Sequence, residues 1–150
     1  MDIQELHANA MNLADEADFL KMQGKETEAC ELYSKSLAAE REAAYEARNQ
    51  HIGEPSEGVL FRSAATLAYG LKDYREAERL ICMGLAGNPP HEIVKELRTL
   101  YDSVSFERDV MEMDSTAQEK EHEQVTITIP IRERNLLKVL VRKFGWVCMF

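Results

Sequence analysis

The stretch GKETEACELYSKSL (residues 24–37) is echoed further along the chain by LKDYREAERLICMGL (residues 71–85). Setting Ala29 against Ala77 brings small and large residues into register, in the pairs Leu32/Leu80, Tyr33/Ile81 and Ser36/Gly84. The residues upstream continue the match, in the pairs Leu13/Phe61, Ala17/Ala65 and Leu20/Ala68. A repeat of this kind indicates two copies of one structural unit, and it therefore decides the fold.

The chain around this repeat has the pattern of successive amphipathic helices. Apolar residues recur every three or four positions over about residues 3–22, 26–48, 59–71, 74–85 and 91–104. Gly24, the loop NQHIGEPSEG (residues 49–58) and the run GNPP (residues 87–90) separate these segments, because glycine and proline end helices. Both residue types are otherwise scarce, and the sequence predicts an all-α domain over residues 1–105.

The order of small and large residues in both units resembles the tetratricopeptide repeat family. The first unit follows the family order with Leu13, Ala17, Leu20, Gly24, Ala29, Tyr33 and Ser36. The second unit follows it with Phe61, Ala65, Ala68, Asp73–Tyr74, Ala77, Ile81, Gly84 and Pro89. Small residues such as Ala17 and Ala65 let paired helices approach closely, while the large ones fill the space beside them.

The resemblance covers about residues 3–104 and implies antiparallel helix hairpins of a right-handed superhelix. Residues 91–104 would then serve as the capping helix. The two units lie 48 residues apart, from Ala29 to Ala77, whereas the family period is about 34. A long second helix and the loop at 49–58 account for the surplus. A microtubule-interacting-and-trafficking domain would also explain residues 3–48, but not the second unit.

The resemblance implies a non-catalytic scaffold that binds a partner peptide or helix in a groove lined by the first helix of each pair. The groove positions are Ala14, Asp18 and Lys21 in the first unit and Arg62, Thr66 and Tyr69 in the second. We expect Arg62 to pair with an acidic group and Tyr69 to offer a flat contact. A family subset clamps a terminal carboxylate with an asparagine where this chain has Thr66.

The end of the chain has a different pattern. Residues 106–124 form an acidic linker or a helix extension, and residues 125–150 a strand–helix tail. The alternating VTITIP (residues 125–130) predicts a strand and ERNLLKVLVRKFGW (residues 133–146) a helix. This order resembles the opening of ribbon-helix-helix proteins and short bacterial antitoxins, although too few residues follow for their second helix.

A lone strand needs a partner for its backbone hydrogen bonds. We therefore expect a homodimer through a strand whose inward side chains are Val125, Ile127 and Ile129. The alternative function that follows from the tail is an antitoxin-like or transcriptional regulator, whose tail dimerises and contacts DNA.

Charge argues against general nucleic-acid binding. The formal net charge is -9, and an acidic surface repels phosphates. The charge is divided, about +4 in residues 125–150 and about −13 in the remainder. The expected partner is therefore a protein or peptide.

No metal, cofactor or catalytic chemistry is indicated by sequence motifs. HExxH, P-loop, GxSxG and GxGxxG patterns are absent, and four histidines are scattered. The three cysteines match no disulfide or metal framework. The first residues lack a signal-peptide pattern, and no apolar run is long enough to span a bilayer, so a cytoplasmic protein is expected. A third hypothesis is a hydrolase whose site is assembled only by folding.

Overall fold

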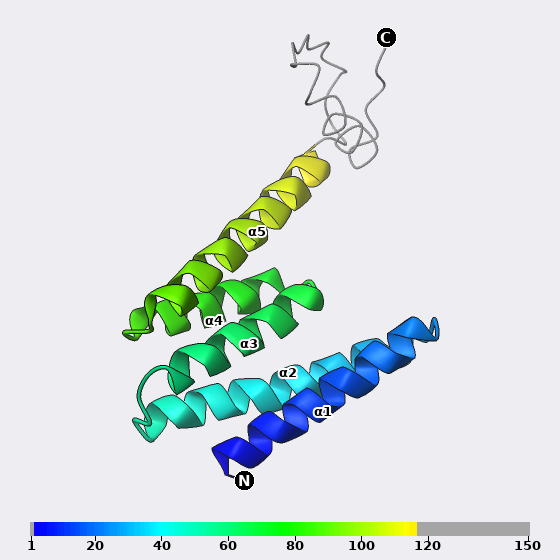
Figure 1. The fold of residues 1–150 in the computed structure, drawn as a ribbon. Helices are drawn as coiled ribbons and strands as arrows, with labels where there is room; N and C mark the ends of the chain where they lie inside the picture. Colours follow the sequence, from blue (N-terminus) through cyan, green and yellow to red (C-terminus); the bar gives the residue numbers. More distant parts are fainter. Residues whose placement is uncertain (1, 117–150) are drawn as a thin grey trace, which may run out of the picture. The chain divides into compact units, whose positions relative to one another are not determined.

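The computed structural model describes residues 2–116, which fold into five α-helices (Figure 1). The helices are α1 (Ile3–Met22), α2 (Glu26–Asn49), α3 (Ser56–Gly70), α4 (Tyr74–Ala86) and α5 (His91–Thr116). These residues contain no strand, and the predicted all-α class is confirmed for them. The predicted strand and helix of residues 125–150 lie outside the described residues.

Consecutive helices pack as antiparallel pairs. α1 packs along α2 and α3 packs along α4, each pair joined by a turn too short for any other arrangement. α2 also packs against α3, which joins the two hairpins, and α5 lies on both α4 and α3. The core runs through these contacts and is built largely from alanine on α2 and α3, with leucine and aromatic side chains between them.

The turns of the two hairpins are built alike. Gly24 has φ 77° and Lys72 has φ 62°, so each chain reversal passes through the left-handed region. The N–H of the next residue, Lys25 or Asp73, donates to the carbonyl five residues earlier over 3.0 Å. This hydrogen bond satisfies a carbonyl that the end of the helix leaves without a partner. The repeat seen in the sequence is therefore also a repeat of backbone geometry.

The aligned small residues occupy equivalent buried positions. Ala29 is the fourth residue of α2 and Ala77 the fourth residue of α4, and both are buried. Ser36 and Gly84 fall at the eleventh position of the same two helices and are also buried. A Cβ atom on Gly84 would lie 3.0 Å from Cδ1 of Leu97. Close helix approach thus requires small side chains at these positions.

The first hairpin also contains buried polar side chains, and each has a partner. Nδ1 of His7 on α1 lies 2.8 Å from a carboxylate oxygen of Glu40, which is fully buried on α2. The buried Ser36 hydroxyl donates to the carbonyl of Ala10 over 2.7 Å. Because an unpaired buried polar group is costly, these two contacts favour one register of α1 on α2.

Two helix bounds differ from those that periodicity indicates. α3 begins at Ser56 rather than near residue 59, and it includes Gly58. The Glu54 carboxylate accepts the N–H of Gly58 over 2.9 Å, and a Cβ atom at this glycine would lie 2.9 Å from Cβ of Pro89. Gly58 is therefore a close-approach residue inside the helix rather than part of the loop. α5 continues to Thr116, well past residue 104, because no helix-breaking residue interrupts its polar end.

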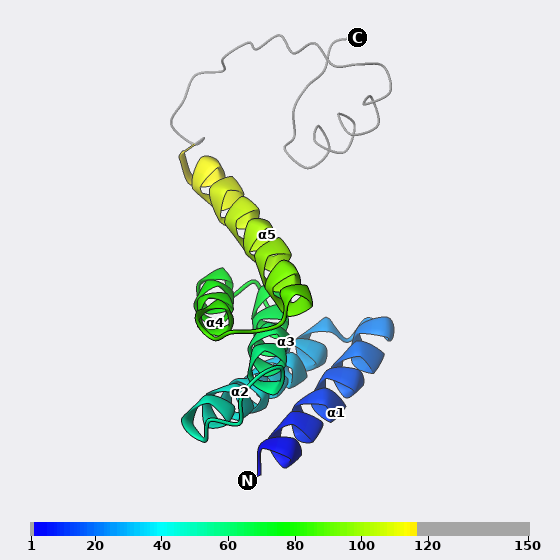
Figure 2. The same ribbon diagram turned by 60° about the vertical axis from the view of Figure 1, so that its left-hand side comes forward.

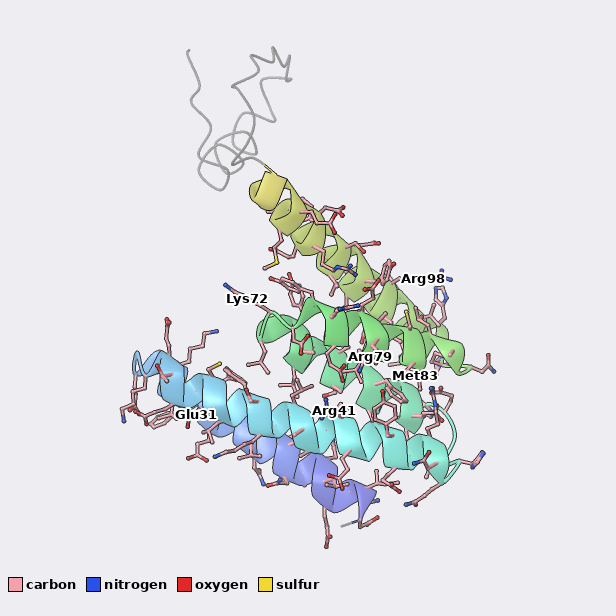
Figure 3. The ribbon with its side chains drawn as sticks, turned by 180° about the vertical axis from the view of Figure 1, so that it is seen from behind. Glu31, Arg41, Lys72, Arg79, Met83 and Arg98 are labelled. Atoms are coloured by element: carbon pink, nitrogen blue, oxygen red, sulfur yellow. The ribbon has the colours of Figure 1, made fainter. Side chains whose placement is uncertain are left out.

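Arg48 joins the two hairpins near the end of α2. Its Nε donates to Oε1 of Glu57 on α3 over 2.6 Å, and its Nη2 donates to the carbonyl of Met83 on α4 over 2.5 Å. The guanidinium also lies 4.5 Å from the ring centroid of Phe61. We call these contacts the Arg48 joint. A second, more exposed link connects the same hairpins, because Arg41 and Glu76 form an ion pair at 3.2 Å (Figure 3 labels Arg41 and Met83).

Replacement of Arg48 tests this joint. Arg48→Met keeps an unbranched side chain over the Phe61 ring but removes every donor, leaving the Glu57 carboxylate, 14% exposed, without its cation. We expect the free energy of unfolding to fall by about 2 kcal/mol, measured by urea denaturation of the full chain. The matched control is Arg79→Met, because Arg79 is 64% exposed and its ion pair stays within α4. Equal stability of the two variants would show that the joint contributes little.

Candidate functional site

Three of the predicted partner-binding residues share one face of α3. Arg62, Thr66 and Tyr69 follow one another at spacings of four and three residues. The Arg62 guanidinium donates to the carboxylate of Glu96 on α5, and the exposed Thr66 hydroxyl donates to the Arg62 carbonyl over 2.9 Å. The Tyr69 ring packs on Tyr74 with centroids 5.8 Å apart. Arg62 is thus paired with an acidic side chain of the chain itself.

An open hollow of about 520 Å³ lies beside this face, and its described lining comes from α5. The lining residues are Glu92, Lys95, Glu96, Thr99, Leu100 and Ser103. Glu96 is both a lining residue and the ion-pair partner of Arg62, so the hollow borders α3. We call the three α3 residues and these six α5 residues the α3–α5 face.

One spacing on the α3–α5 face equals the length of a regular helical repeat. Arg62 and Glu96 are separated by 34 residues, which is the repeat length of the family that the sequence resembles. The same step carries Thr66 to Leu100 and Tyr69 to Ser103. Of these pairs, Arg62 and Glu96 are in direct contact.

Asp18 and Lys21 lie elsewhere. Both are on α1, whose extensive packing among the described helices is with α2, whereas α3 packs on α2, α4 and α5. Lys21 is exposed, and the half-buried Ala14 precedes it on the same helix. The structure thus brings Arg62, Thr66 and Tyr69 together but leaves Asp18 and Lys21 on the first hairpin.

Asp18 is engaged by a neighbour on α2. The Tyr33 hydroxyl donates to the Asp18 carboxylate. This hydrogen bond, together with desolvation and the negative charge of Asp18, raises the pKa of Tyr33 to about 12. The contact ties the two helices together near the hairpin turn, and it leaves less of the Asp18 carboxylate available to a partner.

Sequence reasoning assigned residues 91–104 to a cap and so did not place the α5 residues in the site. A usable signal exists, since stepping 34 residues forward from Arg62 reaches Glu96. The 34-residue spacing is difficult to recognise in the sequence, because the better match, between residues 24–37 and 71–85, has a spacing of 48 residues.

Three further features of residues 2–116 bear on chemistry. Among residues 2–116, no three or more His, Cys, Asp and Glu side chains are grouped so that they could hold a metal ion. In the same part of the chain, no helix has both the length and the apolar character needed to cross a membrane. Cys30 and Cys82 are exposed free thiols on α2 and α4.

The residues predicted for the dimer strand, Val125, Ile127 and Ile129, lie outside the described residues.

The Tyr33–Asp18 contact predicts that Tyr33 loses its proton at a higher pH than an ordinary tyrosine. The folded state holds the Tyr33 proton up to a pKa of about 12, above the ordinary value of about 10. The resulting stability is present below pH 10 and is lost as the pH rises through 12. Absorbance at 295 nm should show a step that Tyr33→Phe removes and that Asp18→Ala moves toward lower pH. Asp15→Ala is the control, since this carboxylate is exposed on the same helix; an identical shift there would contradict a specific hydrogen bond.

Comparison of the chain with models of protein families, with curated proteins and with solved structures finds no match.

Proposed function

We propose that this chain is a non-catalytic, tetratricopeptide-like scaffold whose α3–α5 face receives a peptide or helix of a partner protein. The observation that carries the proposal is the Arg62–Glu96 ion pair, which joins α3 to α5 at a separation of 34 residues beside an open hollow. Stacked repeats with this step present a continuous surface, and such surfaces bind extended partners.

Local geometry supports the family type. Two hairpins have the same turn hydrogen bonds, and the buried small residues of α2 and α4 fall at equal positions. The first hairpin departs from regular repeats because α2 has 24 residues and α4 has 13. On this proposal a regular array begins at α3, and the groove residues predicted on α1 lie outside the α3–α5 face.

The chemistry of the face suits a polypeptide ligand. The exposed hydroxyls of Thr66 and Thr99 each donate to a carbonyl of their own helix over 2.9 Å, and their oxygens can accept a hydrogen bond from a peptide backbone. Glu92 and Lys95 offer one charge of each sign, and Leu100 provides a half-buried apolar floor. A few polar groups around an apolar floor give orientation and specificity without a catalytic arrangement.

A displayed library of random peptides tests this site. Panning on the immobilised full chain should enrich peptides whose binding, measured by calorimetry, is weakened about tenfold or more by Thr99→Trp. The substitution places an indole in the hollow from an exposed position. The control is Lys35→Trp, an equally exposed position of α2. Peptides that bind both variants like the original chain would contradict the proposed site.

We also propose that the chain forms a homodimer through the tail, on the alternation of β-branched residues at 125–130. A strand that pairs across a two-fold axis buries one set of alternate side chains and exposes the other. The inward set would be Val125, Ile127 and Ile129.

Two substitutions, one on each side of the predicted strand, test which side chains lie in the dimer interface. Ile127→Glu should convert the full chain from dimer to monomer in sedimentation velocity, because it places a charge among buried apolar side chains. Thr128→Glu, with its side chain on the opposite side of the strand, should leave the dimer intact. A monomeric starting chain, or equal effects of both substitutions, would exclude this dimer.

A further inference from the structure

Two large apolar side chains are exposed on the side of α1 that faces away from α2. Phe19 is 59% exposed and Met22 is 79% exposed. Met11 and Asp15 precede them on the same side of the helix, at steps of four, four and three residues. We call these four residues the outer α1 face. A helix that packs through one side only normally carries polar residues on the other, so core packing does not explain this face.

Among residues 2–116, no helix covers the exposed part of the outer α1 face, while Met11 at its start is half-buried. α1 lies at the edge of the helical unit, with α2 on its inner side (Figure 2). The inner side of α1 holds Leu6, Ala10 and Ala17, all buried. Large flexible side chains such as methionine, exposed on a helix, adapt readily to an apolar partner surface.

The charges around the outer α1 face specify the sign of a partner. Asp15 lies within the face and Glu16 beside it, and both are exposed. Within the described residues neither forms an ion pair, whereas Asp18 on the other flank is occupied by Tyr33. A partner that buries Phe19 and Met22 must therefore bring positive charge to Asp15 and Glu16.

The same charges argue against two other occupants. A second copy that used this face would set Asp15 and Glu16 near their own equivalents, and like charges in an interface are unfavourable. Cytoplasmic membrane surfaces are also anionic, and they attract lysine and arginine rather than carboxylates. A basic segment of another protein remains the complementary occupant, since the chain's own basic residues 125–150 are assigned above to the dimer.

We infer that the outer α1 face binds a basic amphipathic helix of a partner protein. The apolar side of that helix would cover Met11, Phe19 and Met22, and its lysine or arginine side chains would pair with Asp15 and Glu16. From Met11 to Met22 the face extends about 17 Å, or three helical turns, so a partner helix of similar length covers it. Helix-to-helix docking through anchors at steps of three and four residues is a common recognition mode.

This inference does not depend on the α3–α5 face. Phe19 and Met22 belong to the first hairpin, whereas Thr99 lines the hollow on α5. The two surfaces can therefore be inactivated separately.

A synthetic peptide of leucine and lysine, patterned as an amphipathic helix, is a suitable probe. Fluorescence anisotropy should show that it binds the full chain, and that a scrambled peptide of equal composition binds about tenfold more weakly. The Phe19→Ser, Met22→Ser double variant should lose about tenfold in affinity without any change in charge. Asp15→Lys should weaken binding and reduce its dependence on salt.

Matched controls decide between the outcomes. Thr99→Trp should bind the probe like the original chain, and far-ultraviolet circular dichroism should show that the exposed substitutions preserve the helices. Equal binding of both peptides, or unchanged binding by the double variant, would overturn the inference.

Self-association lost in the double variant would instead assign the face to a second copy. Binding to anionic phosphatidylglycerol vesicles lost in that variant would assign it to a membrane.

Discussion

The Arg48 joint is the contact on which the arrangement of the two hairpins depends. One guanidinium lies over the Phe61 ring, pairs with Glu57 and occupies the Met83 carbonyl near the end of α4. It therefore links α2, α3 and α4 through three kinds of interaction at once. Arginine suits this position because its planar group can stack on a ring while its edge donates several hydrogen bonds. The side chain is 26% exposed, so its charge is shielded from water only in part and the burial cost stays modest.

Around this joint the packing is set by small residues. Small residues at Ala29, Ala77 and Gly84 are buried where helices approach closely. At Gly84 a larger side chain would collide with Leu97 of α5, which packs against this glycine. Such cores rely on complementary shape rather than on large buried side chains. The polar contact of Glu40 with His7 favours one register of α1 on α2. Packing between alanine side chains alone would allow several registers.

Sequence reasoning found the helices and the repeat because both rest on local patterns. The 3.6-residue periodicity locates α1, α2 and α4 closely, and Gly24 marks a turn through its backbone freedom. Gly58 misled the prediction of α3, since its role comes from contact with Pro89, a neighbour that sequence spacing does not reveal. Arg62 was placed correctly on its helix, but its pairing with Glu96 depends on how α5 packs, which is a tertiary property.

The first hairpin is longer than the second, and α1 and the α3–α5 face present two separate surfaces. In a regular array the first helices of successive repeats line one concave side. Here α2 continues past the point where α4 ends in the aligned units, and α3 packs against α2 rather than α1. α1 has an outer side that carries the exposed Phe19 and Met22, while the Arg62–Glu96 ion pair joins α3 to α5. The outer α1 face and the α3–α5 face therefore belong to different helices and share no residue.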